Sequence, residues 1–567
     1  MSNQDLRPVI AYFCMEMALT PTIPTYSGGL GVLAGDTLRA AADMGIPMLG
    51  ISLVHRKGYF RQHLGPLGGQ HETPSSWSPE EILEPVPQQV TLTLSGRAVQ
   101  VRAWLYRVQG IDGGSVPVYL LDTDIPENHP VDRAITDCLY GGGRRYRLLQ
   151  EAVLGLGGVA LLRALGCQVN IYHMNEGHTA LVALALLEER LATQGRSTAT
   201  PADIEAVRRR CVFTTHTPVP AGHDRFPRPV VRAVLGERYT AVLRALDCLE
   251  SNTLDMTRLA ISLAGWLNAV SARHREVAQA MFPHTRLHAI TNGVHATTWV
   301  SPPFHSLYDR YLKGWQRDNF LLRYANAIPL EDIWQAHLEA KHALLGEVEQ
   351  RTGRRIDPSV FTIGFARRAT GYKRMDFLFS DLARLRQIVE RVGRMQVIFG
   401  GKAHPKDAEG KALIRKVFQA AAALGDSLPV VYLEEYDMAL AAKICAGVDL
   451  WLNTPRKPLE ACGTSGMKAA LNGVPSLSIL DGWWLEGHIE GVTGWAIGGR
   501  KPESNPAQEA HALYDKLERV ILPMFYHQPR AYTQVMRCAI AHNGSYFTAQ
   551  RMLHQYLLTA YTPEGQT

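Results

Sequence analysis

At the centre of this sequence lie residues 455–473, Pro-Arg-Lys-Pro-Leu-Glu-Ala-Cys-Gly-Thr-Ser-Gly-Met-Lys-Ala-Ala-Leu-Asn-Gly. A polar turn bounded by Gly463 and Gly466 leads into an apolar pattern that predicts a short helix, and Gly473 stands where a helix commonly ends. Free backbone N–H groups at such a helix start favour a phosphate or a carboxylate. Lys468 is expected in the first turn, where its ammonium would oppose the helix dipole. We interpret the turn as an anion site whose lysine has a chemical role; the alternative is an ordinary helix start with a solvated lysine.

The composition is that of a soluble globular protein, and 567 residues are enough for two or three domains. A formal charge of +6 is too small and too dispersed to predict a nucleic-acid partner. The polar opening, Met1–Arg7, has no signal-peptide pattern, and no apolar run is long enough to predict a membrane span. The eight cysteines include no Cys-x-x-Cys pair, which argues against a zinc ribbon or a disulfide framework. We therefore expect a cytoplasmic protein without a bound metal.

Strand-like apolar runs alternate with helical patterns along most of the chain, which is typical of an α/β protein. One series begins with the strand 9–14, and a second begins with the strand 360–366 after a polar, helical stretch at 301–357. We predict that both halves form doubly wound domains with parallel sheets. The tail, 506–567, is predicted to be mainly helical.

A glycine-rich loop around Gly28, Gly29 and Gly31 follows the first predicted strand and leads into a predicted helix. It only partly matches a dinucleotide fingerprint, because the glycines do not directly follow the strand and no acidic residue ends the second one. A loop that admits a single phosphate or a sugar fits better than a nicotinamide site.

Two histidine-bearing loops follow predicted strands further along, with His178 after 169–174 and His216 after 211–215. Ligands bind at strand ends of this kind in open α/β sheets. Taken singly, each histidine is better read as a hydrogen-bonded structural residue. No close cysteine or carboxylate set makes the pair a zinc site.

Four cations, Arg367, Arg368, Lys373 and Arg374, fall within eight residues at the end of the strand 360–366. Such a cluster repels itself unless an anion compensates it, although solvated surface side chains are the alternative. Together with the turn at Gly463–Gly466, it predicts a phosphorylated cofactor facing a phosphate substrate. No Walker pattern is present, so ATP chemistry is not indicated.

Eight motifs then identify a resemblance. They are YSGGLGVLAGDTL (26–38), NEGHTAL (175–181), FTTHTPVPAGHDRF (213–226), ITNGVHATTW (290–299), FARRATGYKR (365–374), VIFGGKAHP (397–405), GVDLWLNTPRKPLEACGTSGMKAALNG (447–473) and LDGWWLEG (480–487). Over roughly residues 9–500, the chain resembles the α-glucan (glycogen, starch or maltodextrin) phosphorylases, most closely their bacterial branch.

The resemblance implies a GT-B fold, in which two Rossmann-like domains face each other across a catalytic cleft. The N-terminal domain would span 1–300, the C-terminal domain 301–530, and a helical tail at 531–567 would pack back toward the first. The implied reaction is retaining phosphorolysis of an α-1,4-glucan to glucose 1-phosphate, with pyridoxal 5′-phosphate as cofactor. Whether the chain forms a homodimer is left open.

The resemblance also assigns roles to individual residues. Lys468 would carry the cofactor as a Schiff base, and Arg368 and Lys373 would bind the substrate phosphate. The residues around the cofactor would further include Thr464, Ser465, Arg367 and Tyr436. The substrate phosphate and the terminal glucose would contact Gly29, Glu460, Cys462, Gly463, His216 and Asn292. Further residues belong to the matching motifs without a firm role: Tyr372, Glu16, Asn175, Glu176 and His178.

The chemistry agrees with these roles. Cleavage at an anomeric carbon passes through an oxocarbenium-like state that needs nearby negative charge and a proton donor, and no retaining pair of carboxylates is evident. Phosphate can supply both, so the cofactor would act through its phosphate instead of as an electron sink.

Two alternatives remain. A GT-B transferase that uses a nucleotide sugar would share the glycine loop and the basic pair, but it has no reason to keep Lys468. A catalytically weak glucan-binding or regulatory homologue is suggested only by departures from the family pattern at Gly143, Gly371 and Leu485. A fourth departure, Cys462 in place of a serine, is mild if only its backbone is used.

Overall fold

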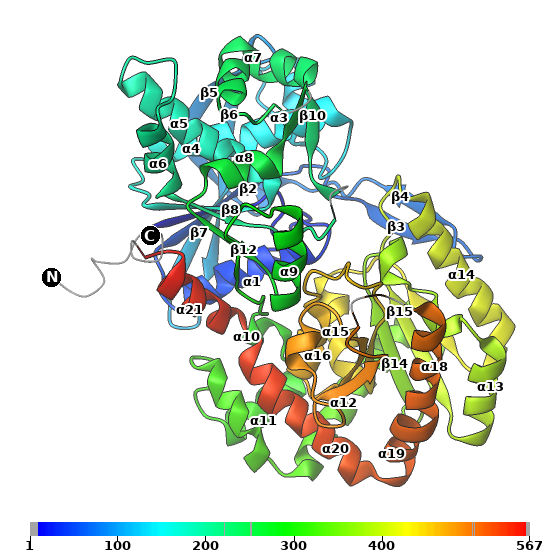
Figure 1. Cartoon of the computed structure of the whole chain (residues 1–567). Helices are drawn as coiled ribbons and strands as arrows, with labels where there is room; N and C mark the ends of the chain where they lie inside the picture. Colours follow the sequence, from blue (N-terminus) through cyan, green and yellow to red (C-terminus); the bar gives the residue numbers. More distant parts are fainter. Residues whose placement is uncertain (1–8, 220–221, 250–251, 502, 504, 563–567) are drawn as a thin grey trace.

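The computed structural model describes residues 9–219, 222–249, 252–501, 503 and 505–562, which are arranged around two large sheets, one in each half of the molecule (Figure 1). The polar opening at 1–7, Pro220 and Ala221 of the 213–226 motif, and the end of the tail at 563–567 lie outside the described residues. Helices surround both sheets, so the structure is mixed α/β, as predicted.

The first sheet has nine strands in the order β13-β12-β9-β8-β1-β2-β7-β6-β5. The strands are β1 (Ile10–Phe13), β2 (Met48–Leu53), β5 (Glu84–Leu94), β6 (Arg97–Gln109), β7 (Ser115–Asp122), β8 (Ile171–Asn175), β9 (Cys211–Thr214), β12 (Trp266–Ala269) and β13 (His288–Ala289). Its helices include α1 (Gly29–Asp43), α2 (Pro130–Arg133), α3 (Arg144–Ala152), the π-helical η4 (Val153–Gly157), α4 (Gly158–Ala164), α5 (Leu181–Thr193), α6 (Pro201–Arg208), α7 (Arg228–Ala245), α8 (Met256–Leu263) and α9 (Ala272–Met281).

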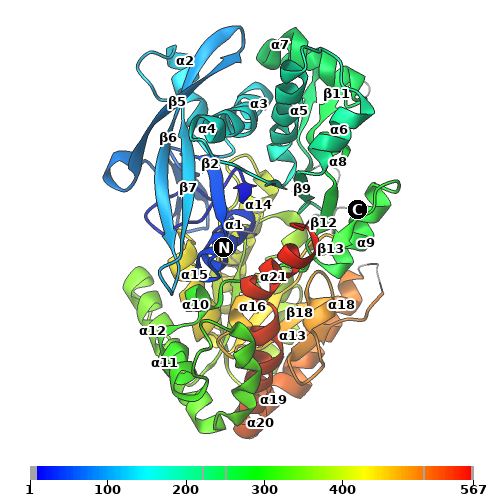
Figure 2. The same ribbon diagram turned by 90° about the vertical axis from the view of Figure 1, so that its left-hand side faces the viewer.

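The prediction of a purely parallel first sheet was wrong at one edge. Strands β5, β6 and β7 pair antiparallel, while the strands from β7 to β13 in the sheet order pair parallel. The link between β5 and β6 is Ser95-Gly96, both with positive φ (54° and 74°). A turn of two residues can join only antiparallel strands, whereas a parallel pair needs a long crossover. The Ser95-Gly96 turn therefore imposes the antiparallel pairing of β5 with β6 at this edge (Figure 2).

The second sheet is parallel throughout, in the order β16-β15-β14-β17-β18-β19. Its strands are β14 (Phe361–Ala366), β15 (Met395–Gly400), β16 (Val430–Leu433), β17 (Leu450–Asn453), β18 (Ser476–Ile479) and β19 (Gly494–Ile497). Helices in this half include α10 (Ala296–Trp299), α11 (Pro302–Tyr311), η8 (Asn319–Ala327), α12 (Leu330–Thr352), α13 (Leu382–Arg391), α14 (Ala408–Leu424), α15 (Met438–Gly447), α16 (Ser465–Ala470), α17 (Trp484–Gly487), α18 (Pro506–Lys516), α19 (Leu522–His527) and α20 (Pro529–Cys538).

Among its parallel strands, each sheet reverses its strand order at one place, between β1 and β8 in the first and between β14 and β17 in the second. In open α/β sheets, ligands bind beyond the carboxyl ends of the strands at such a switch point. Glu16 and Glu176 follow the two strands of the first switch point, and Arg367 and Pro455 follow those of the second. The topology thus selects two loop clusters as candidate binding positions.

The tail connects the two halves. After α20, the π-helical η13 (Ala539–Gly544) leads to α21 (Ala549–Thr559), which lies beside α1 (Figures 1 and 2). Val294 and Thr548 form a backbone bridge, and a Cβ on Gly293, which precedes Val294, would lie 2.0 Å from the Thr548 carbonyl oxygen. Arg551 is buried and donates to the carbonyl oxygens of Thr291 and Asn292. The tail therefore fixes the loop that follows β13.

A short hairpin, β3 (Arg61–Leu64) and β4 (Gln70–Thr73), reaches from the first half to the second beside α14 (Figure 1). Gln62 donates to the Gly401 carbonyl oxygen at 2.9 Å, and Gln70 donates to that of Ala403 at 2.8 Å. The hairpin thereby holds the loop that follows β15.

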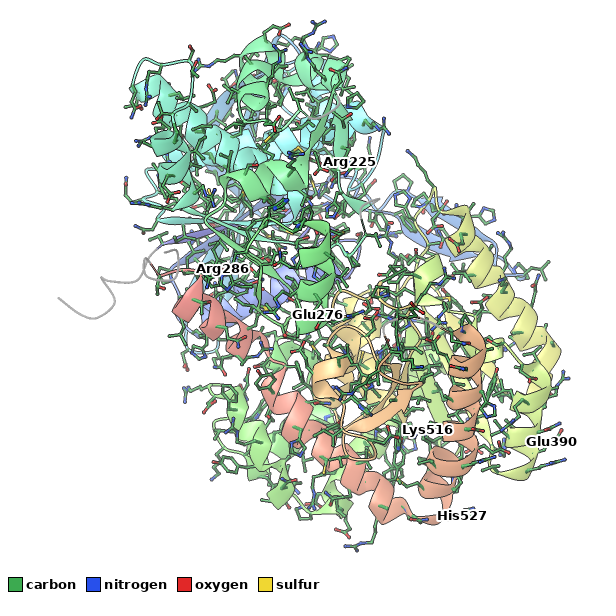
Figure 3. The ribbon with its side chains drawn as sticks, in the orientation of Figure 1. Arg225, Glu276, Arg286, Glu390, Lys516 and His527 are labelled. Carbon is green, nitrogen blue, oxygen red and sulfur yellow. The ribbon has the colours of Figure 1, made fainter. Side chains whose placement is uncertain are left out.

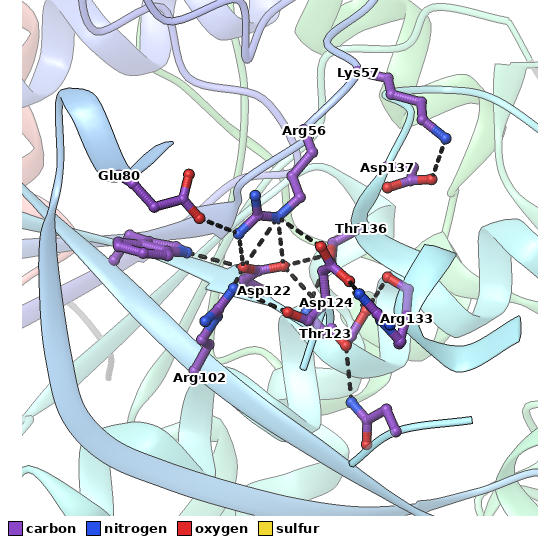
Figure 4. A network of polar contacts seen from close by, with 12 residues as sticks. Arg56, Lys57, Glu80, Arg102, Asp122, Thr123, Asp124, Arg133, Thr136 and Asp137 are labelled. Atoms are coloured by element: carbon purple, nitrogen blue, oxygen red, sulfur yellow. Dashed lines mark hydrogen bonds and ion pairs between the residues drawn. The ribbon is translucent and has the colours of Figure 1, made fainter. Parts of the chain in front are cut away.

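A polar network around Asp122, at the end of β7, orders two further loops (Figure 4). The buried Asp122 carboxylate accepts hydrogen bonds from Arg56, Arg102 and the Trp104 indole, among others. Arg56 also donates its backbone N–H to the Thr136 carbonyl oxygen at 3.1 Å. The loops at 54–60 and 134–140 are in this way tied together.

A second buried charge network joins α12 to the start of β17. Lys341 donates to Asp449 Oδ2 at 2.6 Å and to the Val360 carbonyl oxygen at 2.9 Å, and His337 Nε2 lies 2.8 Å from Asp449 Oδ1. All three side chains are essentially inaccessible to solvent. Burial opposes ionisation of Asp449, but Lys341 and His337 outweigh it and lower the pKa of this carboxyl.

We expect Lys341→Met to lower the free energy of unfolding by about 3–5 kcal/mol, because it leaves the Asp449 carboxylate buried without its cation. Urea unfolding followed by circular dichroism measures the change. Lys443→Met is the control, since Lys443 forms an ion pair with Glu347 while 47% of its side chain is exposed. That control should cost less than about 1 kcal/mol. Equal losses of unfolding free energy in the two variants would contradict the conclusion that burial makes the Lys341–Asp449 ion pair important for stability.

Figure 3 places Glu390 and His527 on the outer surface of the lower half, and Glu276 of α9 near the junction of the halves. Among the described helices, none combines the length and the apolar character that crossing a membrane requires.

Candidate functional site

A cavity of about 1300 Å³ is lined by loops from both switch points. All but one of the residues that the resemblance names line it; the exception is Asn175. The lining residues are Glu16, Gly29, His178, His216, Asn292, Arg367, Arg368, Tyr372, Lys373, Tyr436, Glu460, Cys462, Gly463, Thr464, Ser465 and Lys468. Glu176 lines it as well. The structure therefore brings together side chains that are far apart in the sequence.

Glu16 holds the glycine loop. Its Oε2 accepts the backbone N–H groups of Ser27 at 2.5 Å and Gly28 at 3.2 Å, and its Oε1 accepts the Tyr140 hydroxyl at 2.8 Å. Helix α1 begins directly after these residues, at Gly29. Glu16 thus orients the loop from which Gly29 faces the cavity.

The two predicted histidines are both neutral. Burial lowers the pKa of His178 to about 3, and its Nε2 accepts the Met15 N–H. Burial likewise lowers the pKa of His216 well below its ordinary value. His216 Nε2 lies 2.6 Å from Asn175 Oδ1. The side-chain nitrogen of Asn175 donates to a cysteine sulfur, so its oxygen faces His216 and accepts, and His216 is the donor in this pair. A neutral His216 held in this way can contact an uncharged hydroxyl.

Glu176 fixes the loop that carries His216. Its carboxylate accepts the His216 N–H at 2.8 Å and the Thr217 hydroxyl at 2.9 Å. Its own backbone has φ of 81°, a conformation that side-chain-bearing residues rarely adopt. Such strain concentrates at functional sites.

The basic cluster divides into three environments. Arg367 donates to Glu460 Oε2 at 2.7 Å, and Lys373 Nζ lies 2.6 and 2.7 Å from the two Glu460 oxygens. Burial opposes ionisation of Glu460, but these two cations outweigh it and lower the pKa of its carboxyl. Arg368 is exposed to the cavity, and no hydrogen bond or ion pair joins its guanidinium to the described part of the chain.

Arg374 does not belong to the anion site, contrary to the four-cation prediction. It is buried and binds Glu509 and the carbonyl oxygens of Thr454 and Pro455. Its left-handed backbone, with φ of 49°, turns it away from the other three cations of the cluster, which line the cavity.

The position expected for Lys468 also needs correction. Helix α16 begins at Ser465 and has only six residues, so Lys468 lies in its last turn, where the dipole does not oppose it. Gly473 has a φ of 71°, as expected of a residue that ends a helix. What distinguishes Lys468 is its burial: it is 7% exposed, and burial lowers the pKa of its ammonium.

Trp299 was missed in the sequence. Lys468 Nζ lies 3.7 Å from the centre of its ring, and the Trp299 indole donates to the buried Asp36. No described residue offers Lys468 Nζ a hydrogen bond, so its contact with this ring is a cation–π contact. Trp299 ends the motif at 290–299, but only the packing of α10 against α16 shows what it contacts.

Other lining residues were also missed, among them Tyr59, Arg147 and Asp224. Arg147 donates to Asp224 at 2.9 Å and contacts the fully buried Glu151, whose pKa is raised by burial. The run Gly141–Gly143 before α3 was the available signal, since a glycine run often borders a binding site.

The three departures from the family pattern differ in position. Gly143 lines the cavity. Gly371 instead faces Glu409, whose Oε1 would lie 2.3 Å from an added Cβ, and Leu485 packs against the hydrophobic core. Of the three departures, we therefore expect only Gly143 to affect the shape of the cleft.

The comparisons with known proteins agree with each other. A family model described as carbohydrate phosphorylase matches residues 236–490. The maltodextrin phosphorylase of Thermococcus litoralis is 38% identical, covering 97% of this chain and 70% of its own length. Glycogen phosphorylases of Mycobacterium tuberculosis (36%, covering 100% of this chain and 72% of that protein) and Aquifex aeolicus (34%, covering 98% and 86%) are similar over nearly the whole chain.

Proposed function

This chain belongs to the carbohydrate phosphorylase family, and from that premise we propose that it cleaves α-1,4-glucans with inorganic phosphate. The product is α-D-glucose 1-phosphate, with configuration retained. The observation that carries the proposal is the cavity itself, where Arg367, Arg368, Lys373 and Lys468 face the neutral His216. Cations suit two phosphate groups, whereas a neutral imidazole suits a sugar.

The proposal includes the architecture of this family. We assign the chain a GT-B fold with domains at 1–300 and 301–530 and a tail at 531–567. The order of the second sheet, which is that of a dinucleotide-binding fold, supports this assignment. So do the hydrogen bonds from Arg551 of the tail to the first half.

The residues around Lys468 fit pyridoxal 5′-phosphate. A lysine whose pKa is lowered by burial offers the neutral amine that bonds to an aldehyde. Arg367 Nη1 is buried without a hydrogen-bond partner among the described residues, and it can donate to the cofactor's phosphate. The backbone of Thr464 and Ser465 and the ring of Tyr436 complete the set, while the Ser465 hydroxyl accepts the Trp451 indole N–H. When bound, the cofactor supplies a second phosphate group that titrates near neutral pH.

The chain's own residues then position the substrates. Arg368 and Lys373 bind the attacking phosphate, and the Gly29 N–H at the start of α1 adds a further donor. Asn292 Oδ1 is buried without a hydrogen-bond partner among the described residues, and it accepts a glucose hydroxyl. His216 and the backbone of Cys462 and Gly463 contact other hydroxyls of the same sugar.

Glu460 links the two substrates. It holds Lys373 and Arg367 through the hydrogen bonds described above while it lines the cavity beside Gly463. Phosphate that draws Lys373 to itself leaves Glu460 a free oxygen for a sugar hydroxyl. The relatives described above give no support to the nucleotide-sugar alternative.

The cysteines and the substrates indicate the compartment and the partners that we expect for the enzyme. All eight cysteines are free thiols, which suits a reducing cytoplasm. The partners are the glucan and phosphate. A homodimer stays a prediction, which light scattering on the purified protein checks.

The decisive test is product analysis. Purified protein incubated with maltodextrin and phosphate should release glucose 1-phosphate, which a coupled phosphoglucomutase assay measures, and omission of phosphate should stop the release. A protein that holds its cofactor yet forms no glucose 1-phosphate would instead favour a catalytically weak glucan-binding role.

A further inference from the structure

The turn Leu480–Gly487, which follows β18, contains a buried carboxylate that contacts the site from behind. Asp481 is 3% exposed, and its Oδ2 accepts the backbone N–H of Glu460 at 2.9 Å. Its Oδ1 is buried and has no hydrogen-bond partner in the described chain. Asp481 is not among the residues that line the cavity, so it acts on the site only through Glu460.

The next two residues of this turn fix the same segment. The Trp483 N–H donates to the Cys462 carbonyl oxygen at 3.0 Å. Gly482 has φ of 55°, and a Cβ on it would lie 2.4 Å from that oxygen. The backbone from Glu460 to Cys462 is therefore held at both ends by residues 481–483.

The far end of the turn contacts the first half of the molecule. Glu486 accepts the Ala272 N–H at 3.0 Å and the Thr291 hydroxyl at 2.7 Å. Thr291 precedes Asn292, which lines the cavity. One turn thus braces Glu460 on one side of the cavity and the Asn292 loop on the other.

Three charged groups face Asp481, namely Glu460, Arg273 and Lys457. Burial raises the pKa of Asp481 to about 6, and the Glu460 carboxylate adds to the rise, while the Glu460 N–H and Arg273 oppose it. Asp481 is accordingly ionised above about pH 6 and loses its charge below it. The ionised form is the stronger acceptor for the Glu460 N–H.

We propose that Asp481 is a positioning residue, whose carboxylate anchors the Glu460 amide and so fixes the Glu460 side chain between Arg367, Lys373 and the glucan. This inference rests on the proposed function, in which Glu460 meets the sugar. Without the anchor, the Glu460 segment loses one of its fixed contacts, and small displacements of positioning groups cost a large part of the rate.

Two variants of different chemistry test the proposal in the holoenzyme. Asp481→Ala removes the acceptor, and we expect kcat/KM for maltodextrin to fall by about 10- to 100-fold. The affinity for maltoheptaose, measured calorimetrically without phosphate, should fall as well, and the pyridoxal absorbance should not change. Asp481→Asn keeps an oxygen for the Glu460 N–H, so its kcat/KM at pH 7.5 should stay within about threefold of wild type.

The pH profile separates positioning from a general structural effect. Protonated Asp481 still offers a carbonyl oxygen to the Glu460 N–H, so wild-type kcat/KM should fall by no more than about threefold through an ionisation near pH 6, and Asp481→Asn should lose that step. Glu490→Ala is the matched control, because Glu490 also accepts a backbone N–H, from Ala496 at 3.0 Å, but lies outside the cavity lining. Its rate and pH profile should match those of wild type.

Normal kcat/KM and glucan affinity in Asp481→Ala would overturn the proposal. So would an Asp481→Asn variant that folds with a wild-type thermal midpoint but is as impaired as Asp481→Ala. Absence of glucose 1-phosphate from the wild type would instead overturn the proposed function, and the maltoheptaose affinities would still decide whether Asp481 positions Glu460.

Discussion

Lys468→Ala is expected to reduce phosphorolysis of maltodextrin to background and to abolish the pyridoxal that borohydride fixes to the protein. Lys468 is buried in the lining of the cavity, and burial lowers the pKa of its ammonium, which favours the neutral amine that forms a covalent bond. Lysines at other positions that line the cavity, Lys373, Lys402 and Lys406, already donate to carboxylates or carbonyl oxygens. Loss of the anchor removes the group that supplies the second phosphate.

The measurement combines a near-ultraviolet spectrum, borohydride reduction and mass analysis of the labelled peptide. Wild type should carry the label on the peptide that contains Lys468. Lys443→Ala, which removes a half-exposed lysine of α15 outside the cavity, should be labelled and active like wild type. A label on a different lysine, or a wild-type protein without reducible pyridoxal, would contradict the cofactor assignment.

Arg368→Ala is expected to lower turnover by about 10²–10³-fold while pyridoxal stays bound. Among the described residues, no carboxylate pairs with the Arg368 guanidinium, which faces the cavity, whereas Arg367 and Lys373 share Glu460. Its charge is therefore available to an incoming phosphate. Arg368→Lys keeps the charge but loses the forked geometry, and it should show an intermediate loss.

Steady-state kinetics with phosphate as the varied substrate test this role, and the pyridoxal absorbance reports cofactor content in the same samples. Arg384→Ala is a suitable control, because Arg384 forms an ion pair with an acidic residue of α18 and lies outside the cavity lining. Near-normal phosphorolysis in Arg368→Ala would show that phosphate binds elsewhere.

Much of the architecture was predictable because secondary structure follows local patterns. Buried strands such as β14 and β15 appear as short apolar runs, and their crossover helices follow at regular spacing. The antiparallel edge was not predicted, although β5 alternates and the Ser95-Gly96 turn was visible. The prediction of parallel sheets rests on the alternation of strands and helices. It does not apply to β5 and β6, because the residues of their connecting turn decide that these strands pair antiparallel.

For the site, residue identity was predictable and residue environment was not. The motifs placed the candidate residues at strand ends and helix starts, and all of them except Asn175 and Arg374 line one cavity. The dipole argument for Lys468 was wrong, because a helix of six residues has its first turn next to its last. Arg374 was grouped with its neighbours on sequence spacing, which cannot show that a left-handed backbone points it toward Glu509.

The sequence alone determined the strands, the polar loops at their ends and the chemical types gathered there, because these depend on residues close together in the chain. Only the tertiary structure decided that Glu460 joins Arg367 to Lys373, that Trp299 lies under Lys468, and that Asp481 holds Glu460. The physical reason is that charge compensation, burial and pKa depend on neighbours in space. Residues 455–473 thus contain the chemistry, and α10, β14 and the turn after β18 supply the surroundings in which it can operate.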